Sequence, residues 1–484
     1  MLILRLINNG SISSISIDAN LNKIPGEYQM KTNKIDFITS KPFIIAALLL
    51  LMLIPLSFIK SLVADRSFYR TEAIDSISMP IGGKPQLKGV FIALPYWEER
   101  TKETHSGTIK NVEIIREKKY LLTAPTDYKI VAEVKPYFLS RGIFKVPAFN
   151  ADISVKAEFT PVDFKQFSID ENMFIKDECI LLMGISSSKI LTQFPNFSLN
   201  GKTLKQSELK LSEISPFTDT IFYTLPADEF NAVSAISSKF TIQGSERIDI
   251  VPIATDNEFE MVSTWKSPSF SGGWLPSNRD IMGTGFYANW KIPGLSTAFS
   301  HAWKIDSTHF DFDNPAWSEK NSVRTELILP VDNYQKTTRS VKYGILFLLV
   351  PFIALFLCEL FLKIKVHPIQ YSLIGIADIL FYLLLLSISE HLSFWTSYFI
   401  SATAVCVSTL FYTSGVFKNF KWGLILSGIQ LISYVFLFGT LQAEDYALLI
   451  GSIGLFVVVV LLMALTRKID WYALNKQPND SDSN

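Results

Sequence analysis

The sequence predicts a multi-pass α-helical membrane protein with a large inserted β-rich domain, and three observations lead to this prediction. Apolar residues make up 48% of the 484 residues and gather into six long runs. Charged residues make up only 19%, below the roughly 25% found in ordinary soluble domains. Between the first and second runs, apolar and polar residues alternate instead, as they do in strands.

Charge and cysteine content exclude several classes of protein. The 45 basic and 45 acidic side chains cancel, which excludes a globally basic nucleic-acid binder and an acidic disordered chain. Three cysteines are too few for a disulfide scaffold. The sequence also lacks a P-loop and a dinucleotide fingerprint. We therefore expect the lipid bilayer as a partner, no nucleic acid and no cofactor.

The first apolar run, residues 43–63, has the ~20-residue length that spans a bilayer and carries one charge, Lys60, near its end. A cleaved signal peptide is the alternative, with a weak cleavage site at residues 62–64, but the run is longer than a usual signal core. We therefore predict an uncleaved anchor after a cytoplasmic tail, residues 1–42. Residues 1–29 are either a disordered tail or a start-site artefact, with Met30 as the initiator.

Five further runs predict a bundle of five transmembrane helices. They are residues 343–362, 369–389, 392–413, 421–441 and 446–466. Buried core helices of a soluble protein are the alternative, but runs of this length with short connectors leave no polar face for water. A second tail, residues 467–484, follows the last run.

The basic residues of the short connectors predict the orientation of the spans. When six spans alternate, every basic cluster falls on one side of the membrane. The clustered residues are Lys31, Lys34, Lys41, Lys363, Lys365, Lys418, Lys421, Arg467 and Lys468. The connectors at residues 390–391 and 442–445 hold no Lys or Arg. We therefore expect both termini in the cytoplasm and residues 64–342 on the other side.

Residues 64–342 are expected to form an all-β or β-rich sandwich. Period-two alternation predicts strands, and the examples are residues 129–134, 152–159, 239–243 and 325–329. Asn200 and Gly201 predict a hairpin turn, because both residue types tolerate positive φ. Helical stretches are expected only at residues 64–76 and 207–213.

Several stretches carry a resemblance to a known family. Before the bundle they are residues 70–77 (RTEAIDSI), 141–144 (RGIF), 265–276 (WKSPSFSGGWLP), 285–290 (GFYANW) and 331–334 (VDNY). In the bundle they are residues 342–344 (KYG), 367–375 (HPIQYSLIG), 381–391 (FYLLLLSISEH) and 444–451 (EDYALLIG). Over residues 61–471 the chain resembles the CreD family of Gram-negative inner-membrane proteins.

The resemblance implies a cell-envelope integrity protein of the bacterial inner membrane, with residues 64–342 in the periplasm. It also implies control by a two-component regulatory system and a link to β-lactam susceptibility. It supplies no catalytic residue and no ligand. The motif residues that we single out are Arg141, Gly142, Trp265, Pro268, Gly272 and Pro276.

Motifs for catalysis or metal binding are weak. The pattern S-x-x-K recurs by chance in a chain rich in Ser and Lys, and its partners S-D-N and K-T-G are absent, so we expect no catalytic residue. His309, Asp311 and Asp313 alternate and would face the same way on a strand. Together with His301 they could ligate a divalent cation, although a solvated strand face is the alternative.

Asp378 falls near the centre of a predicted span, where an ionisable group costs at least ~2.5–3.5 kcal/mol. Tyr382, four residues later, lies on the same helix face. Ser427 and Gln430 give a polar stripe to another span, so Gln430 could hydrogen-bond a protonated Asp378 and hold two helices together. A proton relay or a transport site is the alternative.

The loops expected on the periplasmic side carry an acidic rim. Its residues are Glu390, His391, Glu444 and Asp445. The rim is either ordinary interfacial polarity or a docking surface for the β-rich domain or for a cation. At the opposite side, Glu359 can pair with Lys363 four residues later.

An aromatic set with Gly and Pro neighbours has two interpretations. The residues are Trp265, Phe270, Trp274, Phe286 and Trp290. Such a set usually forms a β core, but flat rings also stack on sugars, so a peptidoglycan-binding platform is the alternative.

The sequence therefore predicts a non-enzymatic envelope protein whose periplasmic domain binds an envelope component, such as peptidoglycan, or a partner protein. Two other functions stay open. One is a transporter or flippase built on the helix bundle, and the other is a membrane-bound hydrolase of wall or lipid material.

Overall fold

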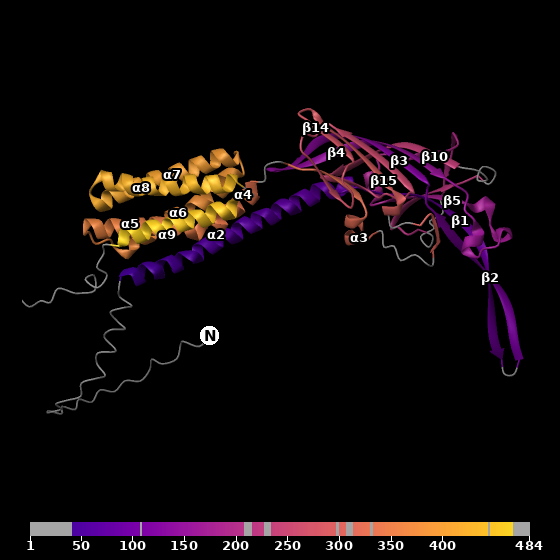
Figure 1. Cartoon of the computed structure of the whole chain (residues 1–484), viewed down its shortest axis with the longest axis horizontal. Helices are drawn as coiled ribbons and strands as arrows, with labels where there is room; N and C mark the ends of the chain where they lie inside the picture. Colours follow the sequence, from indigo (N-terminus) through magenta and orange to yellow (C-terminus); the bar gives the residue numbers. More distant parts are fainter. Residues whose placement is uncertain are drawn as a thin grey trace, which may run out of the picture. The chain divides into compact units, whose positions relative to one another are not determined.

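The computed structural model describes residues 41–106, 109–207, 215–226, 234–296, 300–305, 313–329, 333–443 and 446–467. The chain divides into two compact units (Figure 1). The β unit is Leu62–Gln335, and the helical unit joins Met1–Ser61 to Lys336–Asn484. The β-rich segment predicted at residues 64–342 covers the β unit except its first two residues, together with the first residues of the second part of the helical unit.

Six helices in the described part of the chain are long and apolar enough to cross a membrane. They are α2 (Lys41–Ser78), α5 (Gly344–Leu362), α6 (Pro368–Ser389), α7 (Phe394–Phe417), α8 (Phe420–Gln442) and α9 (Ala447–Thr466). A short helix, α4 (Asn333–Lys342), precedes α5. Each predicted run lies mostly or wholly within one of the six, and the multi-pass helical fold class is confirmed.

The predicted anchor and the helical stretch expected after it form one continuous helix, α2. Pro55 lies inside this helix without ending it. Proline removes one backbone hydrogen bond, but membrane helices tolerate it where neighbouring helices, Ser or Thr side chains or small local adjustments satisfy the freed carbonyl.

The ends of the bundle helices are fixed by local hydrogen bonds. At the start of α6, His367 Nδ1 accepts from the Ile369 N–H, and Gln370 Oε1 accepts from the His367 N–H. α5 and α7 both end at a lysine in the left-handed conformation, Lys363 with a φ of 54° and Lys418 with a φ of 51°. Helices commonly end in this conformation, although glycine is the usual residue there.

The helical unit has an apolar core of its own, which includes Phe352, Tyr371 and Leu426. A Cβ on Gly375 of α6 would lie 2.9 Å from the Phe352 ring, so this glycine allows α5 and α6 to approach closely. α9 has no buried residue, which suits a helix with lipid along most of its sides.

The β unit contains two mixed sheets. The strands of the first are β1 (Gln86–Ser106), β2 (Ile109–Thr123), β5 (Ile180–Ile185), β8 (Lys205–Gln206), β9 (Asp219–Thr224), β11 (Arg247–Ile250), β13 (Pro268–Gly272), β16 (Ala302–Lys304) and β17 (Val323–Leu327). Their order is β13-β17-β11-β1-β5-β9-β8, with β2 paired to both β1 and β16. β1 and β11 are parallel. A short helix, α3 (Pro315–Lys320), precedes β17.

The strands of the second sheet are β3 (Asp127–Arg141), β4 (Phe144–Phe159), β6 (Asn196–Leu199), β7 (Lys202–Thr203), β10 (Ser234–Ser245), β12 (Asp256–Ser263), β14 (Asn278–Met282) and β15 (Gly285–Pro293). Their order is β14-β15-β12-β3-β4-β10-β6-β7, and only β3 and β12 are parallel. One apolar core takes residues from both sheets, such as Leu181 of β5 and Ile153 of β4, so the sheets share their core.

The strands predicted from alternation lie within β3, β4 and β10, and the fourth overlaps β17. Asn200 and Gly201 join β6 to β7 with φ values of 48° and 88°, so the predicted turn is confirmed. The helical stretch predicted at residues 207–213 falls almost entirely outside the described residues.

Candidate functional site

Asp378 lies on α6 with only 5% of its surface exposed, and α8 supplies its hydrogen-bond donors. Gln430 Nε2 and the Tyr434 hydroxyl both donate to the same carboxyl oxygen, Oδ1, and the Tyr434 bond is 3.1 Å long. The structure therefore brings together Asp378 and Gln430, which the sequence placed on two polar helix stripes. Tyr434 lies one helical turn after Gln430, which puts both donors on one face of α8.

Three polar atoms of this cluster have no hydrogen-bond partner among the described residues: Asp378 Oδ2, Gln430 Oε1 and the Tyr382 hydroxyl oxygen. Gln430 and Tyr382 are each 2% exposed. Buried polar atoms in folded proteins nearly always have a partner, because leaving one unpaired is costly. Some polar atoms of the cluster therefore form hydrogen bonds while others do not. A purely structural contact between two helices would be expected to pair all of them.

Two neighbouring hydroxyl groups, on Ser427 and Tyr398, are satisfied within the bundle. Ser427 Oγ donates to the Cys406 carbonyl at 2.9 Å, and the Tyr398 hydroxyl donates to the Tyr434 carbonyl at 2.6 Å. Phe381 packs on Tyr434 with ring centroids 4.4 Å apart. These contacts join α6, α7 and α8 and hold the two polar stripes opposite each other.

Glu359 on α5 is a second buried carboxylate, with 8% of its surface exposed. It forms an ion pair with Lys41 of α2. It also accepts from the Tyr371 hydroxyl at 2.8 Å and from the Val366 N–H at 3.1 Å. The pairing expected with Lys363 is thus replaced by contacts with two other helices and a loop, and every contact supports a structural role.

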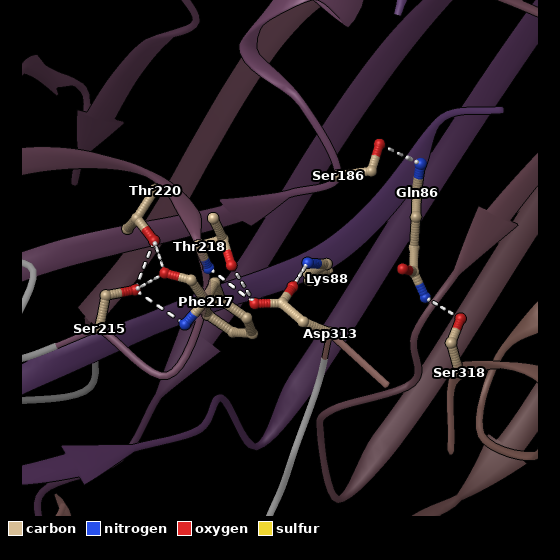
Figure 2. Close-up of polar contacts among 9 residues, drawn as sticks. All are labelled: Gln86, Lys88, Ser186, Ser215, Phe217, Thr218, Thr220, Asp313 and Ser318. Carbon is tan, nitrogen blue, oxygen red and sulfur yellow. Dashed lines mark hydrogen bonds and ion pairs between the residues drawn. The ribbon is translucent and has the colours of Figure 1, made fainter. Parts of the chain in front are cut away.

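Asp313, a predicted metal ligand, lies at a turn just before α3 and not on a strand. Its Oδ1 pairs with the ammonium of Lys88, which is 4% exposed, and its Oδ2 accepts from the Thr218 N–H at 2.9 Å (Figure 2). Burial acts to raise the pKa of Asp313, but the hydrogen bonds from Lys88 and Thr218 outweigh it and lower that pKa. The strand-face prediction is wrong at this residue, whose carboxylate is the counter-ion of a buried lysine.

His301 is half buried, and its Nε2 lies 3.3 Å from Thr160 Oγ1. Burial lowers the pKa of His301, so the neutral ring is favoured. His309 and Asp311 lie outside the described residues. Within the described residues, no group of three His, Cys, Asp or Glu side chains is arranged to hold a metal ion.

The acidic rim is described only in part. Glu390 ends α6, and His391 follows it as an exposed residue in the loop before α7. Glu444 and Asp445 lie outside the described residues, so the docking interpretation of this rim stays a prediction.

The backbone explains why glycine occupies two positions of the motifs singled out above. Gly142 begins the two-residue turn between β3 and β4 with a φ of 60°, and a Cβ there would meet nothing within 4 Å. Gly272 has a φ of 92°, and a Cβ there would lie 2.2 Å from the Ser322 carbonyl oxygen. Arg141 Nη1 donates to Ser76 Oγ at 2.5 Å. These residues therefore shape turns and fix neighbouring segments.

The remaining motif residues surround β13. Trp265 Nε1 donates to the Ser267 carbonyl at 3.1 Å, and its ring centroid lies 5.7 Å from that of Phe138. Pro268 is the first residue of β13, and Pro276 lies between β13 and β14. None of these contacts involves a titratable group, so they support structural roles.

The aromatic set forms part of the β core and not an open platform. Phe286 and Trp290 are 3% and 1% exposed. Phe270 meets both rings edge-on, with centroids 5.6 and 5.7 Å away. Rings buried in this way offer no flat face to a sugar, so the β-core interpretation is the one that these residues support.

An open groove of about 610 Å³ crosses β3, β4, β12 and β15. Lys129 in this groove donates to Glu258 at 2.9 Å and to Glu260 at 3.4 Å. The hydrogen bond to Glu258 is the main reason that the pKa of Lys129 is raised. The lysine is already neutralised by its neighbours, so the groove has little attraction for an anion.

A long hairpin of β1 and β2 is the feature of the β unit that sequence reasoning missed. β1 pairs with β5 only up to Ala93, and β2 pairs with β16 only from Leu121 onward. From Trp97↔Lys118 to Ser106↔Ile109 the two strands pair with each other over ten residue pairs. This two-stranded part, called the ribbon below, projects away from both sheets (Figure 1). At ~3.4 Å per residue it is about 30 Å long.

The ribbon has charged faces and several exposed apolar side chains. Arg116 pairs with Glu99 at 2.9 Å, directly opposite it in the register. Ile114 is 65% exposed, Ile115 is 40% exposed and Trp97 is 40% exposed. Exposed ion pairs contribute little stability, and an isolated hairpin is marginally stable in water. The hairpin is rich in Lys, Arg and Glu and has few runs of β-branched residues. Period-two alternation of apolar and polar residues therefore did not predict it.

Comparisons with known proteins agree with this architecture. The family model described as inner membrane protein CreD matches residues 37–472. The inner membrane protein CreD of Escherichia coli (strain K12) is 25% identical over 428 residues, which cover 88% of this chain and 92% of that protein. The family model's match includes the β unit and the six apolar helices.

Proposed function

The chain belongs to the CreD family of bacterial inner membrane proteins, and from that premise we propose that it is a non-enzymatic envelope-integrity protein whose β unit binds a partner protein in the periplasm. The binding element is the ribbon of β1 and β2. Both termini lie in the cytoplasm in this proposal, because all clustered basic connectors then face inward.

The ribbon is the observation that carries the proposal. Over ten residue pairs, each strand has one backbone edge that no other described strand covers. Uncovered edges of this length are templates for pairing with another chain, and natural proteins usually shorten or cover them. A partner strand that adds to one edge would use these N–H and C=O groups for affinity and side chains such as Ile114 for specificity.

A protein fits this element better than a glycan does. Sugar binding relies on flat aromatic faces, but the exposed apolar side chains near the middle of β2 are Ile114 and Ile115. Phe286 and Trp290 are buried in the core, and Trp97, which is 40% exposed, lies at the base of the ribbon, away from Ile114 and Ile115. Branched apolar side chains beside a free strand edge are typical of protein contacts.

Site-specific photocrosslinking in living cells tests the partner. A photoreactive amino acid at Ile115, which is 40% exposed, should crosslink the full-length protein to another envelope protein. The matched control is Ile143, in the turn between β3 and β4, which is 43% exposed. We expect a crosslinked protein from position 115 and none from position 143. Crosslinks of equal yield at both positions, or to lipid and glycan alone, would contradict the proposal.

Cysteine labelling tests the location of the ribbon. The native cysteines, Cys179, Cys358 and Cys406, are all buried, and burial raises the pKa of Cys179 to about 12. The background of labelling should therefore be low. Ile114→Cys should react with a membrane-impermeant maleimide once the outer membrane is opened. Reaction only after the inner membrane is broken would place the ribbon in the cytoplasm and overturn the proposed orientation.

A further inference from the structure

In the cluster of Asp378, Gln430 and Tyr434 on α6 and α8, the hydrogen bonds fall on one oxygen of Asp378 and leave two oxygen atoms unpaired. Asp378 Oδ1 accepts two hydrogen bonds, from Gln430 Nε2 and from the Tyr434 hydroxyl. Among the described residues, the other oxygen, Oδ2, has no partner, and neither does Oε1 of the same Gln430 amide. Both unpaired atoms are oxygens, and two oxygens cannot hydrogen-bond without a proton between them.

A single proton removes this defect. A protonated carboxyl has one hydroxyl oxygen that donates and one carbonyl oxygen that accepts. If Oδ1 is the carbonyl oxygen, its two donors are explained. Oδ2 is then the hydroxyl oxygen, and Gln430 Oε1 is an unpaired acceptor on the amide that already contacts Asp378. A carboxylate ion would instead leave a buried, partly unpaired charge in hydrocarbon.

In the part of the chain that the structure describes, neutral groups surround Asp378. The titratable groups that the structure places around it are Tyr382 on α6, Cys406 on α7 and Tyr434 on α8. No contact with a Lys or Arg is found for Asp378 among the described residues. Glu359 differs in this respect, because it contacts Lys41.

We propose that Asp378 is a proton-binding site of the helix bundle. The proton on Oδ2 is donated to Gln430 Oε1, while Gln430 Nε2 donates to Oδ1, so that α6 and α8 are joined by a two-bond acid–amide pair. Loss of the proton leaves Oδ2 and Oε1 as two acceptors with no donor between them. The contact between α6 and α8 is therefore coupled to the binding of one proton, independently of any partner at the ribbon.

Infrared spectroscopy of the full-length protein in lipid nanodiscs tests this assignment. The difference spectrum between the wild type and Asp378→Asn at neutral pH should contain the C=O stretching band of a protonated carboxyl, which shifts in D₂O. Asn is close in shape to the protonated acid and can donate to Gln430 Oε1, so the variant should fold. Glu359→Gln is the matched control: its carboxylate has a lysine partner, so its difference spectrum should show carboxylate bands only.

A second variant tests the acid–amide pair itself. Gln430→Leu removes both bonds from the amide, so the carboxyl band should move to higher frequency without disappearing. The proposal is overturned if the Asp378→Asn difference spectrum shows only carboxylate bands, or if Gln430→Leu leaves the band unmoved. It is also overturned if Na⁺ at constant pH converts the carboxyl band to carboxylate while K⁺ does not, since the site would then bind a metal cation.

Discussion

Two buried aspartates, one in each unit, are satisfied in different ways. Asp249 on β11 is 2% exposed and accepts both of its main bonds from Arg324, with Nε 3.0 Å from Oδ1 and Nη2 3.2 Å from Oδ2. Asp378 on α6 is 5% exposed and accepts only from neutral groups, Gln430 and Tyr434, on one of its oxygens. The first carboxyl is paired with a positively charged side chain, and the second accepts hydrogen bonds from neutral groups.

The difference shows what each environment permits. A fork-to-fork ion pair can be buried in a β core because both charges and both oxygens are matched. In a membrane bundle, a carboxyl without a basic partner is better accommodated as a neutral acid that both donates and accepts. The same side chain can therefore be an anion in one unit and, by our proposal, a protonated acid in the other.

The largest expected effect is that of Asp249→Asn. The substitution removes the negative charge opposite Arg324, which is only 7% exposed, and leaves the buried guanidinium with the exposed Glu319, 3.6 Å away, as its remaining ion-pair partner among the described residues. Breaking a buried pair in this way should cost about 3–5 kcal/mol of unfolding free energy. Urea unfolding in detergent, followed by tryptophan fluorescence, measures it. A loss below about 1 kcal/mol would mean that the pair behaves like a surface ion pair and would weaken the comparison.

Asp313→Asn should have the next largest effect, about 1–3 kcal/mol, because Asp313 is more exposed than Asp249 while its partner Lys88 is buried. The folded-state pKa of Asp313 is lowered, so its contribution is present above the unfolded pKa and is lost as the pH falls through the folded one. Wild-type stability should therefore fall below about pH 4, and the variant should lose less there. Parallel pH profiles for the two proteins would contradict this assignment.

Gly142→Ala provides a reference that involves no charge. Its φ of 60° is costly for any residue with a Cβ, although the space around it is open. The expected loss is about 1 kcal/mol. Gly283→Ala is the control, because Gly283 also has open space and no left-handed φ, and it should change stability by less than about 0.5 kcal/mol. Equal losses in thermal unfolding would exclude the backbone explanation.

Asp378→Asn should have the smallest effect, within about 0.5 kcal/mol in the same unfolding assay, because a neutral amide replaces a neutral acid. It is the same substitution as at position 249, so the two variants compare the two environments directly. A loss at position 378 as large as that at position 249 would show that Asp378 is a paired anion, and the contrast between the units would disappear.

Hydropathy and spacing predicted much of this architecture. Runs of about 20 apolar residues leave few alternatives to spanning helices, since hydrocarbon satisfies no backbone polar group. Period-two alternation located strands in β3, β4 and β10, and Asn200-Gly201 located a turn. Helical spacing also put Asp378 and Gln430 on polar stripes that the structure brings into contact.

The rest depends on contacts between residues far apart in sequence. Lys88 and Asp313 are separated by 225 positions, so no local pattern could pair them. The same holds for Asp249 and Arg324, which meet because β11 and β17 are neighbours in one sheet. The ribbon escaped prediction because its exposed strands carry charges in place of a buried alternating face.

The left-handed lysines at the ends of α5 and α7 have a consequence for how topology and helix geometry are linked. Lys363 and Lys418 supply charge that would hold their loops at the inner surface, yet their backbone shape is one that glycine adopts more easily. Replacing either residue by glycine would relax the chain at the helix end while removing a positive charge from the loop. At these two positions the proposed orientation favours lysine, whereas the local backbone conformation favours glycine.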